Sequence, residues 1–386
     1  MASKAGKNTP IPLIIGAGGI NPAGRVSGHH AYRRLVIDSL SRKKQERTYL
    51  SLAKLMNREK TESINESDRQ YILNHTLIRK IEAFDTSKVL WQTPLSFLAS
   101  DSEQNEFNLN KKNIPDSLRS RLNIPNSESD VLRVKTQEQI DVLLPEYRES
   151  KVTSAGQLPS GFDPGSLYAS RSHPRALQMT IYAASDAIRS TGFSIDQLRN
   201  MVPPDQIAVY SGSAMGQLDE ESYGGLLQNA LIGKRPSSKH CALGLPEMAG
   251  DFVNAYVLGS VGETAGIIGA CATFLYNVKR GMDDIRTGNK RIVVVGNSEA
   301  PVQPQVIEGY RVMGALADDE SLKTLDNSDV CDNRRACRPF SSNSGFTVAE
   351  ASVWIVLMDD ELALEVGARN LGAVGDVFVN ADGYKK

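Results

Sequence analysis

An amphipathic helix that leads directly into an all-apolar strand constrains the fold of this chain more than any other feature. From Phe274 to Ile285 apolar positions recur at helical spacing, and Gly288 ends the pattern. That apolar face consists of Phe274, Leu275, Val278, Met282 and Ile285. The next segment, "RIVVVGNSEA" at 291–300, is apolar without alternation, as expected of a strand that is covered on both faces. Such a strand requires helices on both sides of its sheet.

The same alternation of strand and helix patterns runs through much of the chain. A strand pattern from Pro12 to Ile15 precedes a glycine-rich turn, and a helix pattern runs from Pro174 to a stop at Gly192. A second strand is predicted in "QIAVYSGS", a helix around "PEMAGDFVNAYVLG", and a further strand or hairpin in 337–360. These patterns predict an α/β fold.

Charge and cysteine content exclude several classes of protein. Lys and Arg number 44 against 45 Asp and Glu, which leaves no electrostatic signature for binding nucleic acid or an anionic membrane. Four cysteines in 386 residues do not make a disulfide framework. The run "IPLII" is too short for a signal peptide or a membrane span. We therefore expect a polar tail at 1–10 and a cytoplasmic protein with neither a membrane segment nor a nucleic-acid partner.

The segment between about residues 30 and 165 interrupts the α/β alternation. Up to residue 97 it is charged and helical in pattern, and from 99 to 164 it is rich in Ser, Asn, Asp, Glu and Pro without a steady period. We interpret 30–165 as a helical and loop insertion on the surface of one large domain, residues 11–370, and not as a separate domain.

Two motifs suggest other chemistries but fit them poorly. "GAGGINPAG" lacks the last glycine of a dinucleotide-binding fingerprint, because Asn21 stands there and Pro22 follows where a helix should open. "VVVGNSEA" presents Ser298 after a strand, as a hydrolase would, but Pro301 and Pro304 interrupt the helix that must follow. A plain turn is the better interpretation of the first motif, and a hydrolase is disfavoured.

Three of the four cysteines do not form a metal motif. Cys331 and Cys337 have a spacing that matches no common zinc knuckle, and His240-Cys241 has no second histidine at a ligand interval. We interpret them as scattered structural cysteines and expect no bound metal.

Cys271 differs because it stands between Ala270 and Ala272 in the first turn of the predicted amphipathic helix. A free cysteine is most often a small buried hydrophobe. At a helix N-terminus, however, backbone N–H groups and the helix dipole stabilise a thiolate, and alanine neighbours leave room for a substrate. Such N–H groups also suit half of an oxyanion hole for a thioester carbonyl. The residues alone leave both interpretations open, a core cysteine and a nucleophile.

Two segments resemble the β-ketoacyl synthases of the thiolase-like fold. "GACATFLYNVKRGMDDIRTGNKRIVVVGNSEA" is similar to their nucleophile block, and "CRPFSSNSGFTVAEASVWIVL" is similar to their RPF…GF…GEGA segment, with Glu350 at the glutamate position. The resemblance implies a layered α-β-α-β-α fold in which Cys271 is the acyl nucleophile, flanked by Ala270 and Ala272. It also implies that Glu350 supports the site without taking part in the chemistry.

Within this family, "GRVSGHHAYRRLVIDSL" and "GQLPSGFDPGSLYASRSHPRAL" resemble the FabY-type synthases most. The resemblance implies a 3-oxoacyl-ACP synthase, an acyltransferase of fatty acid biosynthesis. An acyl group from a short acyl-CoA, typically acetyl-CoA, passes to Cys271, and malonyl-ACP loses carbon dioxide to supply the carbanion that attacks it. The resemblance further implies acyl carrier protein as a partner, a homodimer, and neither a metal nor a redox cofactor.

The chain departs from the family in its histidines. These enzymes combine the cysteine with two histidines that follow it, whereas all five histidines here precede it: His29, His30, His75, His173 and His240. Residues 371–386 resemble only the first strand of the second fold repeat. We expect either a fragment or truncated form of a longer synthase, or a non-catalytic half that pairs with another subunit. The first is favoured because such partner subunits usually lack the cysteine.

Overall fold

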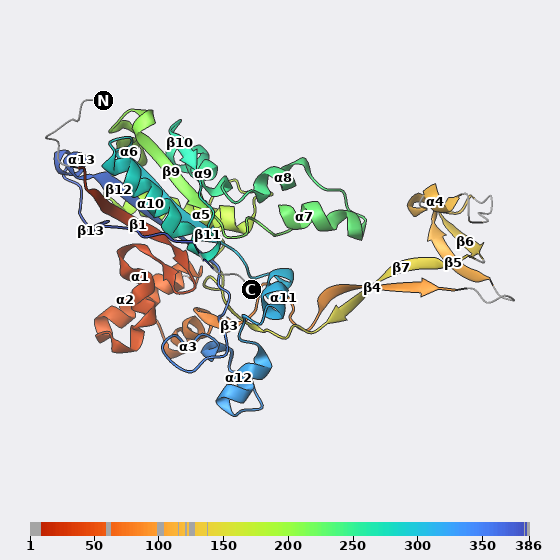
Figure 1. The fold of residues 1–386 in the computed structure, drawn as a ribbon. Helices are drawn as coiled ribbons and strands as arrows, with labels where there is room; N and C mark the ends of the chain where they lie inside the picture. Colours follow the sequence, from red (N-terminus) through yellow and green to blue (C-terminus); the bar gives the residue numbers. More distant parts are fainter. Residues whose placement is uncertain are drawn as a thin grey trace. The chain divides into compact units, whose positions relative to one another are not determined.

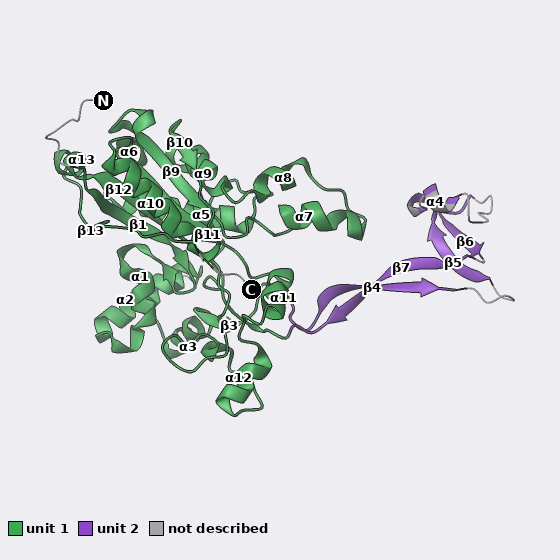
Figure 2. Ribbon diagram, viewed as in Figure 1, with its two compact units in different colours: residues 1–84, 151–386 green, residues 85–150 purple. Residues whose placement is uncertain are grey.

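The computed structural model describes residues 9–58, 63–98, 104–114, 116–119, 122, 128–136, 138–381 and 383. The chain forms two compact units, one of residues 1–84 and 151–386 and one of residues 85–150 (Figure 2). The expected polar tail, 1–10, and the expected start of a second half, 371–386, lie partly outside the described residues.

The larger unit is built on one mixed sheet with the strand order β10-β9-β11-β12-β1-β13 (Figure 1). Its strands are β1 (Pro12–Asn21), β9 (Ile207–Gly212), β10 (Glu263–Ala265), β11 (Ile292–Glu299), β12 (Ala351–Asp359) and β13 (Gly372–Ala373), and the short β2 (Gly24–Arg25) pairs with β1. β9 runs parallel to β10 and β11, whereas β12 is antiparallel to both β11 and β1. β1 and β11 therefore run in the same direction, and their carboxyl ends lie at the same edge of the sheet.

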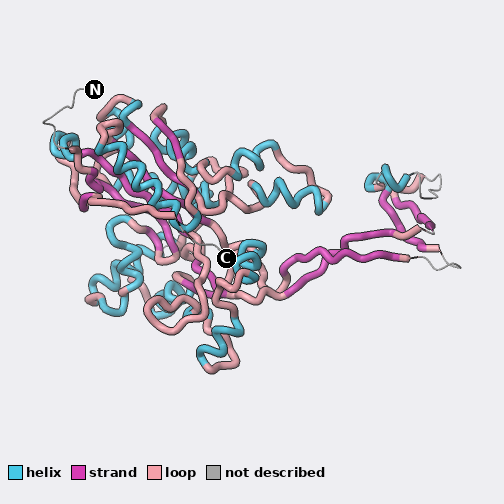
Figure 3. The backbone as a smooth tube through the Cα atoms, viewed as in Figure 1, coloured by secondary structure: helices cyan, strands magenta, loops and turns pink. Residues whose placement is uncertain are grey.

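Helices cover both faces of this sheet, as the apolar strand required (Figure 3). Along β11, Ile292 and Val294 join the core beneath α5 (Arg175–Ser190) and α9 (Met248–Val253). Val293 and Val295 join the core beneath α10 (Thr273–Arg286). Because alternate side chains of a strand point to opposite faces, β11 is buried on both. The predicted α/β class is confirmed.

The glycine-rich segment after Ile15 is part of a strand, and the expected turn comes later, at Pro22 and Ala23 between β1 and β2. β1 continues to Asn21 and stays paired with β12 as far as Ile20. The glycines are needed because α5 lies very close: a Cβ on Gly18 would lie 2.2 Å from the backbone nitrogen of Ala187. Close packing of helix on strand, not a change of chain direction, explains this run of glycines.

The two amphipathic helices form where the sequence placed them. α5 begins directly after Pro174, and α10 ends before Gly288, whose φ of +77° suits glycine. Met282 and Ile285 are buried as expected, but Leu275 is 53% exposed, so the buried face of α10 is narrower in its first turn.

Three helices after β2 form a small cluster of their own, made of α1 (His30–Leu35), α2 (Arg42–Leu55) and α3 (Glu66–Asn74). Its core consists of Ile37, Tyr49, Leu52, Ala53, Met56, Ile64 and Ile72.

The short β3 (Ile78–Lys80) then pairs with β8 (Ser154–Gly156). Further α-helices of this unit are α6 (Ile195–Asn200), α7 (Tyr223–Gln228), α8 (Ser238–Gly244), α11 (Pro304–Val312), α12 (Asp319–Asp326) and α13 (Asp360–Glu365). No helix in the described part of the chain is both long and apolar enough to cross a membrane.

The described residues of the smaller unit form two β-ribbons, a 3-10 turn at Lys111–Asn113 and one short helix. β4 (Val89–Phe97) pairs with β7 (Ile140–Arg148), and β5 (Asn105–Asn110) pairs with β6 (Val131–Thr136), with α4 (Asp116–Arg119) between β5 and β6 in the chain. A small apolar core is made of Ile114, Leu122, Leu132 and Val134. The boundaries differ from the expected insertion at 30–165. Residues 30–84 and 151–165 belong to the larger unit, and only 85–150 form a compact unit of their own.

Candidate active site

Cys271 lies in a 3-10 turn, Ala270–Ala272, that leads directly into α10. The helix-tip position expected from the sequence is therefore correct. The side chains of Cys271, Ala270 and Ala272 are all exposed. The interpretation of Cys271 as a buried core residue is wrong, and its thiol is open to a substrate.

Two buried side chains of α10 fix this turn in an unfavourable conformation. Ala270 has a φ of +48°, a left-handed conformation that is costly for a residue with a Cβ. The hydroxyl of Thr273 accepts from the N–H of Gly269 at 3.0 Å and donates to the carbonyl oxygen of Ala270 at 2.7 Å. The amide of Asn277 donates to the carbonyl of Ile267 and accepts from its N–H, both at 3.0 Å. Both side chains are fully buried, so the turn is held firmly.

Tyr310, on α11, contacts residues from two other segments, and burial and the charge of Cys271 both affect its pKa. Burial, followed by the nearby charges of Cys271 and Glu299, raises the pKa of Tyr310. Its hydroxyl donates to the sulfur of Met215 at 3.3 Å, and its ring meets the ring of Phe346 edge-on with centroids 5.3 Å apart. Phe346 belongs to the segment before β12. Tyr310 therefore contacts the second of the two segments that carry the family resemblance.

Glu299, the last residue of β11, is a carboxylate with three hydrogen-bond donors. It accepts from the N–H of Ala214 at 2.5 Å, from the hydroxyl of Ser213 at 3.0 Å and from the amide of Asn297 at 2.9 Å. Burial raises the pKa of Glu299, and these hydrogen bonds only partly offset that effect. Glu299 thus fixes the loop after β9 to the end of β11, beside Tyr310.

An apolar cavity of about 370 Å³ opens at Tyr310. This volume is in the range of small-molecule sites, which bury most of a ligand against apolar side chains. Its walls come from the loop after β9, from α7 and from α11, and include Met215, Leu218, Tyr223, Leu227, Val306, Tyr310 and Met313. Tyr310 lines this cavity, and burial and the charge of Cys271 both contribute to the raised pKa of Tyr310.

Glu350 is buried, with 4% of its surface exposed, and it pairs with Arg175 at the start of α5. A buried carboxylate needs such a partner, because burying it unpaired is costly. Burial alone would lower the pKa of Arg175, but the hydrogen bonds and charge of Glu350 raise it. No contact joins Glu350 to Cys271 within the part of the chain that the structure describes. The pair holds α5 to β12 instead.

The other candidates from the sequence lie elsewhere. Ser298 is 1% exposed and hydrogen-bonded to Thr180 and Ser352, which gives a hydrolase nucleophile no access. Burial, and then the charge of Asp319, raise the pKa of the Cys331 thiol to about 11. Among the described residues, no group of three or more His, Cys, Asp or Glu side chains could hold a metal ion.

Among the described residues, four of the five histidines form hydrogen bonds, each to a residue other than Cys271. His30 contacts Ser51, His75 contacts Tyr71, His173 contacts Tyr168 and His240 contacts Ser237. Within the described residues, none of the five histidines is hydrogen-bonded to the cysteine.

Four residues of the site were not predicted from the sequence: Thr273, Asn277, Glu299 and Tyr310. The sequence does indicate Thr273 and Asn277. They are two polar residues four positions apart, on the buried side of the amphipathic helix that follows the cysteine. Glu299 stands at a strand end after "GNS" and was noted only as part of the motif. No local sequence pattern indicates Tyr310, because its contacts with Met215 and Phe346 join residues that are distant in the sequence.

The family model for the N-terminal domain of β-ketoacyl synthases matches residues 123–363. The chain therefore belongs to the β-ketoacyl synthase family, as the segments around Cys271 and Glu350 indicated. The curated β-ketoacyl-[acyl-carrier-protein] synthase FabY of Pseudomonas aeruginosa is 47% identical over 393 aligned positions, which cover 97% of this chain and 62% of FabY. Nodulation protein E of Rhizobium leguminosarum bv. trifolii is 27% identical over 213 positions, covering 53% of this chain and 46% of that protein.

Solved structures agree with this assignment. The crystal structure of the noncanonical ketosynthase FabY from P. aeruginosa matches with a TM-score of 0.94 at 46% identity, covering 100% of this chain and 63% of that one. The ishigamide ketosynthase/chain length factor has a TM-score of 0.54 at 18% identity, over 95% of this chain and 62% of that one, which shows the shared fold alone. The predicted thiolase-like fold is confirmed. The chain spans about 62% of the length of the FabY relative.

Proposed function

We propose that this chain is the acyl-accepting part of a β-ketoacyl-[acyl-carrier-protein] synthase, an acyltransferase of fatty acid biosynthesis. In the first step the thiolate of Cys271 attacks the carbonyl carbon of a short acyl-CoA, with acetyl-CoA as the proposed substrate. A bond forms between that carbon and the Cys271 sulfur, the bond to the CoA sulfur breaks, and CoA leaves as its thiolate. The observation that carries the proposal is an exposed thiol on a firmly held turn at the start of α10. We propose that the apolar cavity at Tyr310 takes the acyl chain.

The second step is a decarboxylative Claisen condensation with malonyl-ACP. Loss of carbon dioxide leaves an electron pair on the α-carbon, and that carbon attacks the acyl carbonyl. The bond to the Cys271 sulfur breaks, the thiolate returns, and β-ketoacyl-ACP leaves. No electrons are gained or lost overall, so the reaction needs no redox cofactor, and we propose from the family that it uses no metal.

The proposed partners follow from the same chemistry. Acyl carrier protein delivers the malonyl group, and acyl-CoA delivers the acyl group. A homodimer and a cytoplasmic location are proposed from the family. A non-catalytic half that pairs with another subunit is the weaker alternative, because this chain keeps its cysteine exposed.

The two steps can be tested separately with the purified chain, acetyl-CoA and malonyl-ACP. We expect acetyl transfer to the protein but only slow formation of β-ketoacyl-ACP. Condensation needs hydrogen-bond donors for the charge that develops on the malonyl thioester, and loss of one such donor typically slows a reaction by about 100-fold or more. No histidine in the described chain contacts Cys271. FabY from P. aeruginosa serves as the positive control for condensation. Acetyl transfer that persists in Cys271→Ser, or fast condensation by that variant, would contradict the proposal.

A further inference from the structure

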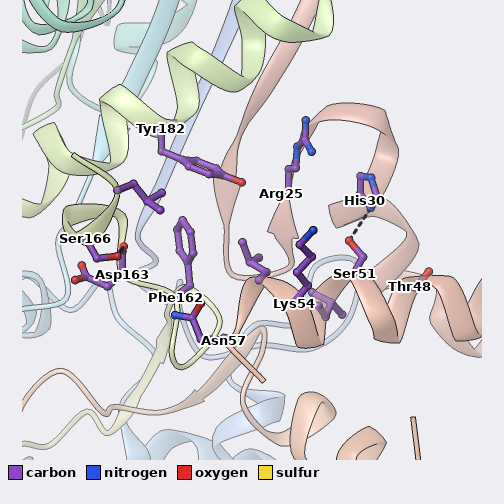
Figure 4. A pocket seen from close by; sticks show the side chains of 13 residues that line it. Arg25, His30, Thr48, Ser51, Lys54, Asn57, Phe162, Asp163, Ser166 and Tyr182 are labelled. Carbon is purple, nitrogen blue, oxygen red and sulfur yellow. Dashed lines mark hydrogen bonds between the residues drawn. The ribbon is translucent and has the colours of Figure 1, made fainter. Parts of the chain in front are cut away.

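A second cavity, of about 340 Å³, lies in the larger unit near the N-terminal helical cluster (Figure 4). Its walls come from α2, from the Arg25–His30 segment, from the loop around Phe162 and from α5. It shares no lining residue with the apolar cavity at Tyr310. The family model begins at residue 123, so the α2 wall lies outside the residues that define the family.

One side of this cavity carries two cations with unused donors (Figure 4). Arg25 donates from Nε to the buried carboxylate of Asp186 at 2.5 Å, yet its side chain remains 45% exposed. Asp186 also accepts from Gly19 and Ser27, so it anchors the arginine firmly. The terminal nitrogens of Arg25 donate to no described residue. Lys54 likewise forms no ion pair with the described part of the chain, which leaves both groups available to an anion.

The surrounding segment strengthens this positive end. Residues 25–58 contain nine Lys and Arg against two Asp and Glu, in a chain whose net charge is −1. Such a local excess of one sign attracts ligands of the opposite sign.

The middle of the cavity is apolar and aromatic. The rings of Phe162 and Tyr182 meet edge-on with centroids 5.0 Å apart, and Leu52, Leu55 and Leu167 complete the wall. The Tyr182 hydroxyl has no hydrogen-bond partner among the described residues, and in Figure 4 it points toward the Arg25 side. Burial raises the pKa of Tyr182 to about 12, so the hydroxyl keeps its proton as a donor at neutral pH.

The far side is acidic. The carboxylate of Asp163 accepts from the N–H of Gly165 at 3.0 Å and lies opposite the two cations (Figure 4). A second negative group on a ligand would be repelled here, whereas a hydroxyl or amide N–H would find an acceptor. The cavity is thus positive at one end, apolar in the middle and hydrogen-bond accepting at the other end.

We propose that this cavity binds a small organic anion. Its carboxylate or phosphate lies between Arg25 and Lys54 and accepts from Tyr182, and its apolar chain runs along Phe162 toward Asp163. This site is distinct from the acyl-cysteine site at Cys271 and takes no part in the proposed condensation.

Three probes with the same apolar chain test the proposal by isothermal titration calorimetry: octanoate, octyl phosphate and 1-octanol. The two anions are expected to bind at least tenfold more tightly than the alcohol, because only they can pair with Lys54 and Arg25. The tighter of the two identifies a carboxylate or a phosphate as the natural head group. Equal affinity for all three probes, or binding of none, would overturn the proposal.

Single variants locate the bound probe. Lys54→Met and Tyr182→Phe are each expected to weaken anion binding about threefold to tenfold. Lys80→Met, which removes another exposed lysine without an ion pair among the described residues, should leave it unchanged. Tyr310→Phe alters the apolar cavity that is proposed to take the acyl chain. If Tyr310→Phe weakens binding and Lys54→Met does not, the probe occupies the acyl site and the proposal is wrong.

Discussion

Arg175 donates to both carboxylate oxygens of Glu350, from Nε to Oε2 at 2.5 Å and from Nη2 to Oε1 at 2.8 Å. The N–H of Leu158 adds a third hydrogen bond to Oε1 at 2.7 Å. These contacts join the first residue of α5, the segment just after β8 and the residue just before β12. Since Glu350 is buried, these donors take the place of water around its carboxylate, and we propose that its role is to hold together α5, β12 and the segment after β8.

Glu350→Gln tests this role. The substitution keeps the shape of the side chain but removes the charge that Arg175 pairs with, and breaking a buried pair is strongly destabilising. Because the Arg175 side chain is 40% exposed, water replaces part of the loss, and we expect a decrease of about 2 kcal/mol in the free energy of unfolding. Urea denaturation measures it.

The matched control for this prediction is Glu320→Gln. Glu320 pairs with Lys323 on the surface, where its side chain is 79% exposed, so its loss should change stability by less than about 0.5 kcal/mol. Alkylation of Cys271 should survive in Glu350→Gln. An unchanged melting temperature in that variant would contradict the structural role of the pair.

The parts of the fold that local pattern determines were predictable. α5, α10 and β11 follow from apolar spacing and from stop signals such as Gly288, and the need of Glu350 for a partner follows from its apolar surroundings. The glycines of β1 were misread, because their cause is the approach of α5, which is distant in sequence. Tyr310 and Glu299 were missed for the same reason. The ribbon of β4 and β7 pairs segments about 50 residues apart, so no local pattern marks its boundaries.

Thr273→Val tests the clamp on the turn before α10. Valine has nearly the shape of threonine but lacks the hydroxyl that bonds to Gly269 and Ala270. We expect a loss of about 1–3 kcal/mol in stability, because the N–H of Gly269 loses its acceptor. Acylation of Cys271 should also slow, since Ala270 is no longer held in its left-handed conformation. Thr287→Val, at the exposed end of α10, is the control and should leave acylation unchanged. Wild-type acylation in Thr273→Val would show that the clamp does not position the thiol.

Glu299→Gln tests the effect of burial on this carboxyl group. Its pKa is raised in the folded protein, whereas in the unfolded chain it lies near the usual value of about 4.3. Between these two pKa values the folded state binds more protons, so the contribution of Glu299 to stability falls as the pH rises. The stability of the wild type relative to Glu299→Gln should therefore decrease with rising pH through this window. Urea denaturation at a series of pH values measures it. An increase with pH would indicate a lowered pKa instead.

The four cysteines should differ in their rates of alkylation by iodoacetamide. Cys271 should react fastest, because its thiol is exposed at a helix tip between alanines. Cys331 should react slowest, since its half-buried thiol has a pKa raised to about 11 and carries little thiolate at neutral pH. Cys241 and Cys337 are exposed and should be intermediate. Peptide mass spectrometry after a short exposure gives the order, and equal labelling of Cys271 and Cys337 would argue against an activated thiol.

Acylation of Cys271 by a short acyl-CoA tests the central claim most directly. The purified chain is incubated with acetyl-CoA, quenched in acid and digested, and the acetyl group is located by peptide mass spectrometry. We predict a thioester on the peptide that contains Cys271, removable by hydroxylamine, present in Cys337→Ser and absent in Cys271→Ser. Acetylation found only on other cysteines, or no acetylation of a folded chain, would contradict the assignment of Cys271 as the acyl nucleophile.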